Sequence, residues 1–107
     1  MVVRIVRMSF HERNVTSFLS LFHEFSDRIR AVSGCNHLEL WQDMDRPNVM
    51  TTYSLWDSVE ALEAYRESEL FRTTWEKARV FFDASPVASS HTIKVALPAS
   101  DRPTSSI

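Results

Sequence analysis

The acid–base groups with the most suggestive spacing in this 107-residue chain are His37 and Glu39. They lie two residues apart in residues 37–42 (HLELWQ), an alternating segment that places both side chains on one face of a strand. A carboxylate beside an imidazole orients the ring, so the pair could serve as a general base and its orienting partner if that face meets a cavity. If that face meets another subunit, the pair is an interface contact.

Aromatic side chains are spaced so that they could hold a flat ligand. Tyr65 and Trp75 fall on one helical stripe, and Tyr53 falls in a strand of a central hairpin. Such rings stack on planar molecules, and a tyrosine hydroxyl can hydrogen-bond a reacting oxygen. We therefore predict His37 and Tyr65 as catalytic residues, with Tyr53 and Trp75 binding substrate. The alternative is that this stripe is core.

Arg4 is the third candidate for binding substrate. In the alternating segment 2–10 it shares a face with Val6, whereas Arg7 lies on the opposite face. A guanidinium near a covered sheet is costly unless it is paired. Arg4 is thus expected either to stabilise a substrate anion in the pocket or to pair with Glu39 across strands.

The remaining composition excludes several classes of protein. No pair of histidines has the spacing of metal ligands, so we predict no metal site. The four histidines are His11, His23, His37 and His91. The single cysteine, Cys35, cannot form an internal disulfide, which favours a reducing compartment. The net charge of -2 without a basic run argues against nucleic-acid binding. No apolar run approaches the roughly 20 residues that cross a bilayer. We expect a cytoplasmic protein without a cofactor.

Apolar periodicity predicts the elements that must position these side chains. Gly34, the only glycine, is expected to end the first helix with a positive φ. Asp57 with Glu60 has the spacing of a capping box, and Ser68 is expected to restart the second helix after a bend. The predicted strands cover residues 2–10, 37–42, 49–56 and 88–97, and the predicted helices cover residues 15–32, 58–66 and 68–83.

This order is βαββαβ, a ferredoxin-like α+β fold whose four-stranded antiparallel sheet carries its helices on one face. The strands are nevertheless apolar on both faces, and residues such as Val3, Ile5, Leu38 and Leu40 are more apolar than a sheet with one exposed face would require. A patch of that kind marks an interface, so we expect a homodimer through the sheet. We predict one domain over residues 1–97 and a flexible tail over residues 98–107.

Residues 34–75 also carry a family pattern. Gly34-Cys35 precedes the strand HLELWQ, Trp56 precedes S-x-E-A-L after one residue, and Ser68-x-x-Phe71 follows. This resembles the antibiotic biosynthesis monooxygenase family of dimeric α+β barrel proteins, over nearly the whole chain to about residue 97. The resemblance implies that Trp56, Leu62 and Phe71 hold the corner between sheet and helix, and that Ser58 or Asp57 caps the helix.

The family resemblance implies a range of activities. Its members include cofactor-independent oxygenases of quinol-like polyketides, quinol oxidases, haem-degrading enzymes and proteins without known activity. The residues of the haem-degrading branch would fall at Val6, Tyr65 and Trp75, and none of the three matches. We therefore expect a cofactor-independent monooxygenase or quinol oxidase acting on a small aromatic or polyphenolic substrate. The alternatives are a non-catalytic ligand-binding or dimerisation module, and haem binding through His23 or His37.

Overall fold

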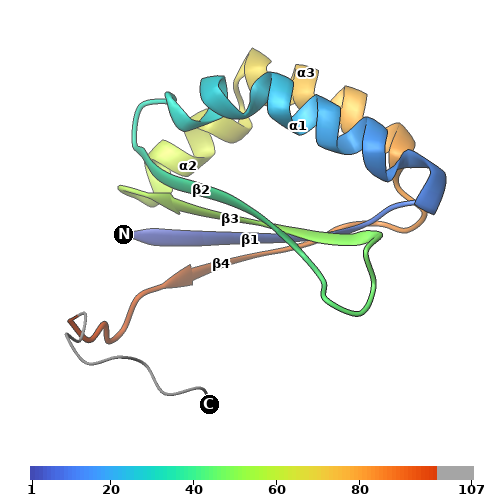
Figure 1. Cartoon of the computed structure of the whole chain (residues 1–107). Helices are drawn as coiled ribbons and strands as arrows, with labels where there is room; N and C mark the ends of the chain where they lie inside the picture. Colours follow the sequence, from blue (N-terminus) through green and yellow to red (C-terminus); the bar gives the residue numbers. More distant parts are fainter. Residues whose placement is uncertain (99–107) are drawn as a thin grey trace.

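The centre of the protein is a four-stranded antiparallel sheet, with the strands in the order β2-β3-β1-β4. The computed structural model describes residues 1–98. The strands are β1 (Val2–Ser9), β2 (Cys35–Gln42), β3 (Val49–Trp56) and β4 (Val87–Thr92), and the helices are α1 (Val15–Arg30), α2 (Val59–Arg66) and α3 (Glu69–Ala78), with short 3-10 turns at Glu12–Asn14 and Arg79–Phe81. All three helices cover one face of the sheet (Figure 1). The predicted ferredoxin-like α+β fold is confirmed.

Helix α1 forms because its apolar residues recur every three or four positions. Phe18, Leu21, Phe25 and Ile29 are buried against the sheet as one stripe. The chain leaves the helix through Gly34, whose φ of +88° confirms the predicted left-handed position. A Cβ at this glycine would also lie 2.5 Å from the Ala61 Cβ, so α2 packs directly against this turn.

The second helical segment is divided in two by its capping residues. Ser58 Oγ accepts a hydrogen bond from the Ala61 amide at 3.1 Å and begins α2. Ser68 Oγ accepts one from the Phe71 amide at 3.1 Å and begins α3, as the sequence predicted. Of the two residues predicted as the cap of this helix, Ser58 is confirmed and Asp57 is not, because the Asp57 carboxylate accepts a hydrogen bond from Asn36 Nδ2 at 2.6 Å instead.

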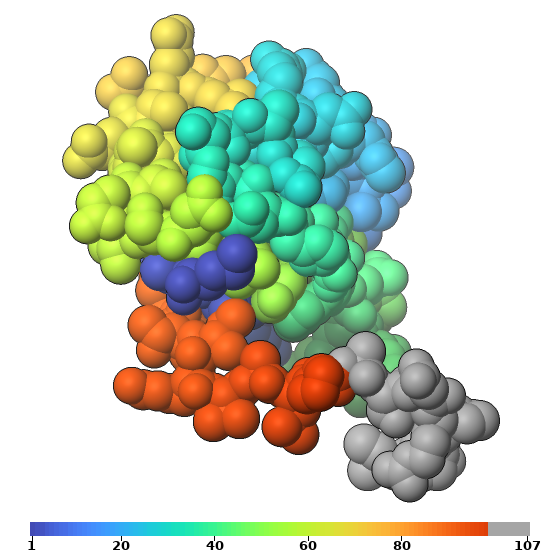
Figure 2. Space-filling model, turned by 90° about the vertical axis from the view of Figure 1, so that its left-hand side faces the viewer, coloured from blue at the N-terminus to red at the C-terminus, as the bar shows by residue number. Residues whose placement is uncertain are grey.

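The last strand is shorter than predicted. β4 ends at Thr92, which pairs with Val2, the first residue of β1. Residues 93–97 therefore run beyond the end of β1, where no neighbouring strand can accept their hydrogen bonds. Figure 2 shows this segment, orange to red, along the edge furthest from the helices. The predicted flexible tail, residues 98–107, lies outside the described residues apart from Pro98.

The core lies between the sheet and the helices. Its largest fully buried side chains are Trp56, Phe10 and Met50. Phe10 stacks on Phe18 of α1, with ring centroids 4.3 Å apart. This packing fills one end of the layer between the sheet and the helices, towards the carboxyl end of β1.

Candidate active site

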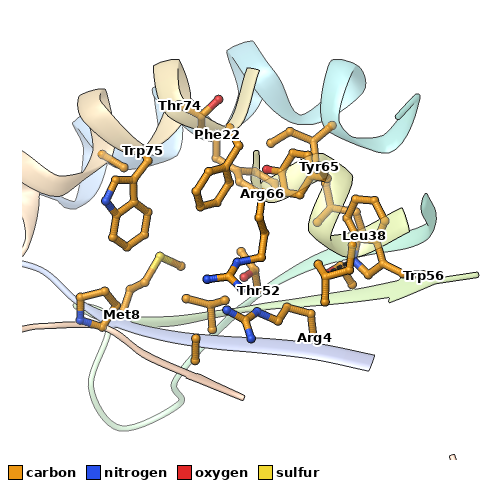
Figure 3. A pocket seen from close by; sticks show the side chains of 18 of the residues that line it. Arg4, Met8, Phe22, Leu38, Thr52, Trp56, Tyr65, Arg66, Thr74 and Trp75 are labelled. Carbon is orange, nitrogen blue, oxygen red and sulfur yellow. Dashed lines mark hydrogen bonds between the residues drawn. The ribbon is translucent and has the colours of Figure 1, made fainter. Parts of the chain in front are cut away.

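A cavity of about 550 Å³ opens between the sheet and the helices (Figure 3). That volume suits a small organic ligand. Its walls are mainly apolar and aromatic, with contributions from β1, β3, α1, α2 and α3. The polar side chains in the lining are Arg4, Thr52, Ser54, Tyr65, Arg66 and Thr74. Among the described residues, the lining contains positive charge and hydroxyl groups but no carboxylate and no imidazole.

Tyr65 stands in this wall as a neutral hydrogen-bonding group. Its ring stacks on Trp56 and meets Phe71 edge-on, with centroids 5.0 Å and 5.3 Å away. Burial, with a smaller contribution from Cys35, raises the pKa of Tyr65 to about 12. Within residues 1–98 the hydroxyl has no hydrogen-bond partner, and no polar side-chain atom is buried unpaired. The neutral hydroxyl is therefore free to donate to a ligand.

Trp75 belongs to both the core and the cavity. Its indole stacks on Phe71 with centroids 6.0 Å apart and tilts against Phe82 at 5.6 Å. The side chain is half-buried and lines the cavity. The aromatic stripe of the sequence thus has one side in the core and the other facing open space.

Arg4 enters the cavity from the sheet. Its side chain projects towards the helices, and its Nη1 donates a hydrogen bond to Ser90 Oγ at 3.0 Å. The alternative pairing with Glu39 does not occur, because the two side chains lie on opposite faces of the sheet. Burial lowers the pKa of Arg4, the nearby Arg66 charge lowers it further, and Glu63 opposes both.

Arg66 is a lining residue that the sequence reasoning missed. It ends α2, and its Nη1 lies 3.1 Å from Glu63 Oε1. The sequence did contain a signal for this position, because Arg66 follows Leu62 by four residues and therefore lies on the same face of the helix. Leu62 is buried and also lines the cavity.

His37 and Tyr53 lie on the opposite face of the sheet from the cavity. The predicted pairing of His37 with Glu39 is present, at 2.6 Å between Nε2 and Oε2. Trp41 Nε1 also donates to Glu39 at 2.7 Å, and these two contacts lower the pKa of Glu39. Tyr53 stacks on Trp41 with centroids 5.3 Å apart. Strand alternation turns Leu38 and Ser54 into the cavity and these four side chains away from it.

His37, predicted as a base if its face met a cavity, and Tyr53, predicted to bind substrate, therefore do not line this cavity. The sequence could show that His37 and Glu39 share a face but not which face the helices cover. His23 of α1 and His37 of β2, the alternative haem ligands, are also not part of the lining.

Other potential reactive groups are scattered. Across residues 1–98, no group of three histidine, cysteine or acidic side chains could hold a metal ion. Cys35 is buried, and burial raises the pKa of its thiol. Nor does any helix of the described part have the length and apolar character needed to cross a membrane.

Comparison with known proteins supplies a family. The model of the family described as "Antibiotic biosynthesis monooxygenase" matches residues 1–77. A comparison with curated proteins finds no match.

Solved structures share the fold at low sequence identity. A crystal structure of an antibiotic biosynthesis monooxygenase is 17% identical, covers 92% of this chain and 100% of its own, and has a TM-score of 0.81. A conserved protein from Methanosarcina mazei is 17% identical, and the match covers 88% of this chain and 94% of that protein with a TM-score of 0.82. The third structure is SnoaB from Streptomyces nogalater, a cofactor-independent oxygenase solved as a point mutant. It is 17% identical, and the match covers 92% of this chain and 97% of SnoaB with a TM-score of 0.81. At such identity these likenesses establish the fold alone.

Proposed function

The chain belongs to the antibiotic biosynthesis monooxygenase family, and we propose that its cavity oxidises a small aromatic or polyphenolic substrate with molecular oxygen, without a metal or organic cofactor. The observation that carries this proposal is the chemistry of the lining. Aromatic walls suit a planar ring, and the polar groups are hydroxyls and guanidinium groups. SnoaB, with the same fold, is a cofactor-independent oxygenase.

The reaction needs no electron source beyond the substrate. In the oxygenase form, an anthrone-type methylene reacts with O₂, one oxygen atom becomes the new carbonyl, and the other leaves as water with both methylene hydrogens. In the oxidase form, a hydroquinone gives two electrons and two protons to O₂, which yields the quinone and hydrogen peroxide. Both forms begin with a phenolate or enolate, which is electron-rich enough to react with oxygen.

Tyr65 and Arg4 are proposed to favour that anion. The Tyr65 hydroxyl is protonated near pH 7, and burial, which raises its pKa to about 12, keeps it so at higher pH; it is proposed to donate a hydrogen bond to the substrate oxygen. Arg4 adds positive potential, which lowers the pKa of a phenol bound nearby. Since the lining within residues 1–98 offers no carboxylate or imidazole, the proton is proposed to leave to water at the open end of the cavity.

Trp75 and the other aromatic walls are proposed to orient the ring and exclude water. A dry site strengthens the hydrogen bond from Tyr65 to the developing anion. Loss of water from the ring also contributes to binding, at about 25 cal/mol for each Å² of apolar surface removed from solvent.

We also propose that the open face of the sheet pairs with a second copy of the chain. Val3, Ile5, Tyr53 and Leu55 are half-exposed there, and Trp41 is 45% exposed. These side chains form a continuous apolar and aromatic surface across three strands in register. In such a homodimer, His37 with Glu39 would be an interface contact.

The second candidate function is binding without catalysis. The absence of a general base from the described lining favours it, because a ligand could be held by the same aromatic walls and guanidinium groups. Oxygen uptake distinguishes the two. A panel of hydroquinones and anthrone-type phenols should give turnover above the buffer rate, whereas tight binding without oxygen uptake would establish the binding module.

A further inference from the structure

We propose that Arg4 and Arg66 form an anion-binding subsite at the open end of the cavity, and that this subsite selects aromatic ligands bearing a carboxylate. The inference rests on the proposed function for the aromatic part of the ligand. The binding of the charged end depends on the sheet register and on the two guanidinium groups.

The sheet carries a polar row beneath the helices, near one end. Arg4 pairs in register with Ser54 of β3 on one side and with Ser90 of β4 on the other. Near the opposite end of the same face, Met8 is paired with Met50 and both are buried. The Arg4 guanidinium flanked by two hydroxyls therefore contrasts with the apolar pair that packs into the core at the other end.

The charge of Arg4 has no acidic partner within ion-pair distance among the residues that the structure describes. Its hydrogen bond goes to the neutral Ser90, and no carboxylate of residues 1–98 lies within ion-pair distance of it. Ser54 is already an acceptor for Trp56 Nε1 at 2.9 Å. A partly buried cation without a counter-charge is unfavourable, and an anionic ligand would remove that cost.

A second cation approaches the first from the helical side. Arg66 extends from the end of α2 towards Arg4 on β1, and the two guanidinium groups face one another in Figure 3. Among residues 1–98, the acid that pairs with Arg66 and acts on the charge of Arg4 is Glu63, so two positive charges are matched by one negative charge. The remaining positive charge would attract one monoanion.

The free N–H groups suit a carboxylate. Each guanidinium has five N–H donors, and within the described part of the chain the hydrogen bonds involve Nη1 alone, to Ser90 for Arg4 and to Glu63 for Arg66. Arginine binds the two oxygens of a carboxylate in a planar fork. With its carboxylate held there, the ring of the ligand would extend into the apolar cavity towards Tyr65 and Trp75.

The test is a comparison of two ligands of the same shape. Titration calorimetry would measure 2-naphthoate, which is charged at pH 7, and the neutral 2-naphthamide, in the wild type and in Arg4→Gln, Arg66→Gln and Arg72→Gln. Arg72 is exposed on α3 outside the lining and controls for the loss of one charge. We expect the wild type and Arg72→Gln to bind the acid about tenfold more tightly than the amide, and the other two variants to lose that preference.

Several outcomes would overturn the subsite. Equal affinity of acid and amide in the wild type would do so, as would a preference that survives in Arg66→Gln, whose exposed helical position keeps the variant folded. Binding of neither ligand would also do so. Because the readout is binding, equal affinity combined with oxygen uptake from neutral phenols would reject the subsite and leave the proposed function standing.

Discussion

Tyr65 of α2 stacks on Trp56 at the end of β3, with ring centroids 5.0 Å apart and 23° between the ring planes. The indole is almost fully buried and is fixed by its Nε1 hydrogen bond to Ser54. The stack therefore joins the rigid end of the sheet to the helix that closes the cavity. It holds the Tyr65 ring in place, so the tyrosine hydroxyl is presented by a packed aromatic pair and not by a mobile side chain.

Replacing Tyr65 by phenylalanine removes the hydroxyl and keeps the stacked ring, so the variant tests the hydroxyl alone. The ring contacts with Trp56 and Phe71 would remain, so we expect the free energy of unfolding to change by about 1 kcal/mol or less. Removal of one donor to a developing anion should lower kcat by about 10²-fold with little change in KM. Oxygen-uptake kinetics would measure both constants. Thr73→Val, which removes an exposed hydroxyl from α3, is the matched control, and an equal loss of activity in it would contradict the assignment.

The raised pKa of Tyr65 predicts a pH dependence of stability. The ordinary value of 10.0 applies to the unfolded chain, and burial raises the folded value to about 12. Between these values the folded state retains a proton that the unfolded state releases, so the free energy of unfolding falls as pH rises through this window. Below pH 10 this contribution is fully present.

Urea unfolding at pH 9 and pH 11 would measure this fall in the wild type and in Tyr65→Phe. The variant should lose less stability than the wild type between the two pH values. Since the chain has two tyrosines, absorbance at 295 nm would follow the same titration directly. An identical fall in both proteins would show that Tyr65 is not responsible.

Gly34→Ala should destabilise the fold. The residue needs a φ of +88°, and an added Cβ would lie 2.5 Å from the Ala61 Cβ. We expect a loss of about 2–4 kcal/mol from backbone strain and overpacking, measured by urea unfolding. Ser33→Ala, at the exposed neighbouring position, should change stability by about 0.5 kcal/mol or less. Comparable losses in the two variants would contradict the argument.

Ile5→Arg should disrupt the proposed homodimer. Ile5 lies in the middle of the open face of the sheet, paired with Tyr53 and Ser89 on its two sides. Light scattering after size exclusion should give twice the 12.4 kDa chain mass for the wild type and a single chain mass for the variant. Val80→Arg changes an exposed valine on the helical side and should remain dimeric. A monomeric wild type would contradict the proposal.

Local features of the fold could be predicted because they depend on neighbouring residues. Gly34 as the helix stop and Ser68 as a cap follow from backbone chemistry, and residues 49–56 were predicted with the bounds observed for β3. The end of β4 could not be predicted, because it depends on where β1 begins in the paired register.

The candidate site was only partly predictable for a related reason. Alternation showed that His37 and Glu39 share a face, but strands apolar on both sides do not reveal which face the helices cover. Tyr65 and Trp75 could be predicted because they lie on the apolar stripe of the helices. Arg4 could be predicted because alternation along β1 places it on the same strand face as Val6. Arg66 was missed because a charged residue at a helix end ordinarily faces solvent.

The most direct test of the central claim is oxygen uptake by purified protein treated with a chelator, with 1,8-dihydroxyanthrone and 1,4-naphthohydroquinone as substrates. The wild type and Arg72→Gln should consume oxygen above the buffer rate. Thr74→Phe, which would place a ring in the cavity from α3, should lose at least about tenfold in kcat/KM while its circular dichroism is unchanged. Uptake at the buffer rate in the wild type, or full activity in Thr74→Phe, would contradict the proposal that oxidation takes place in this cavity.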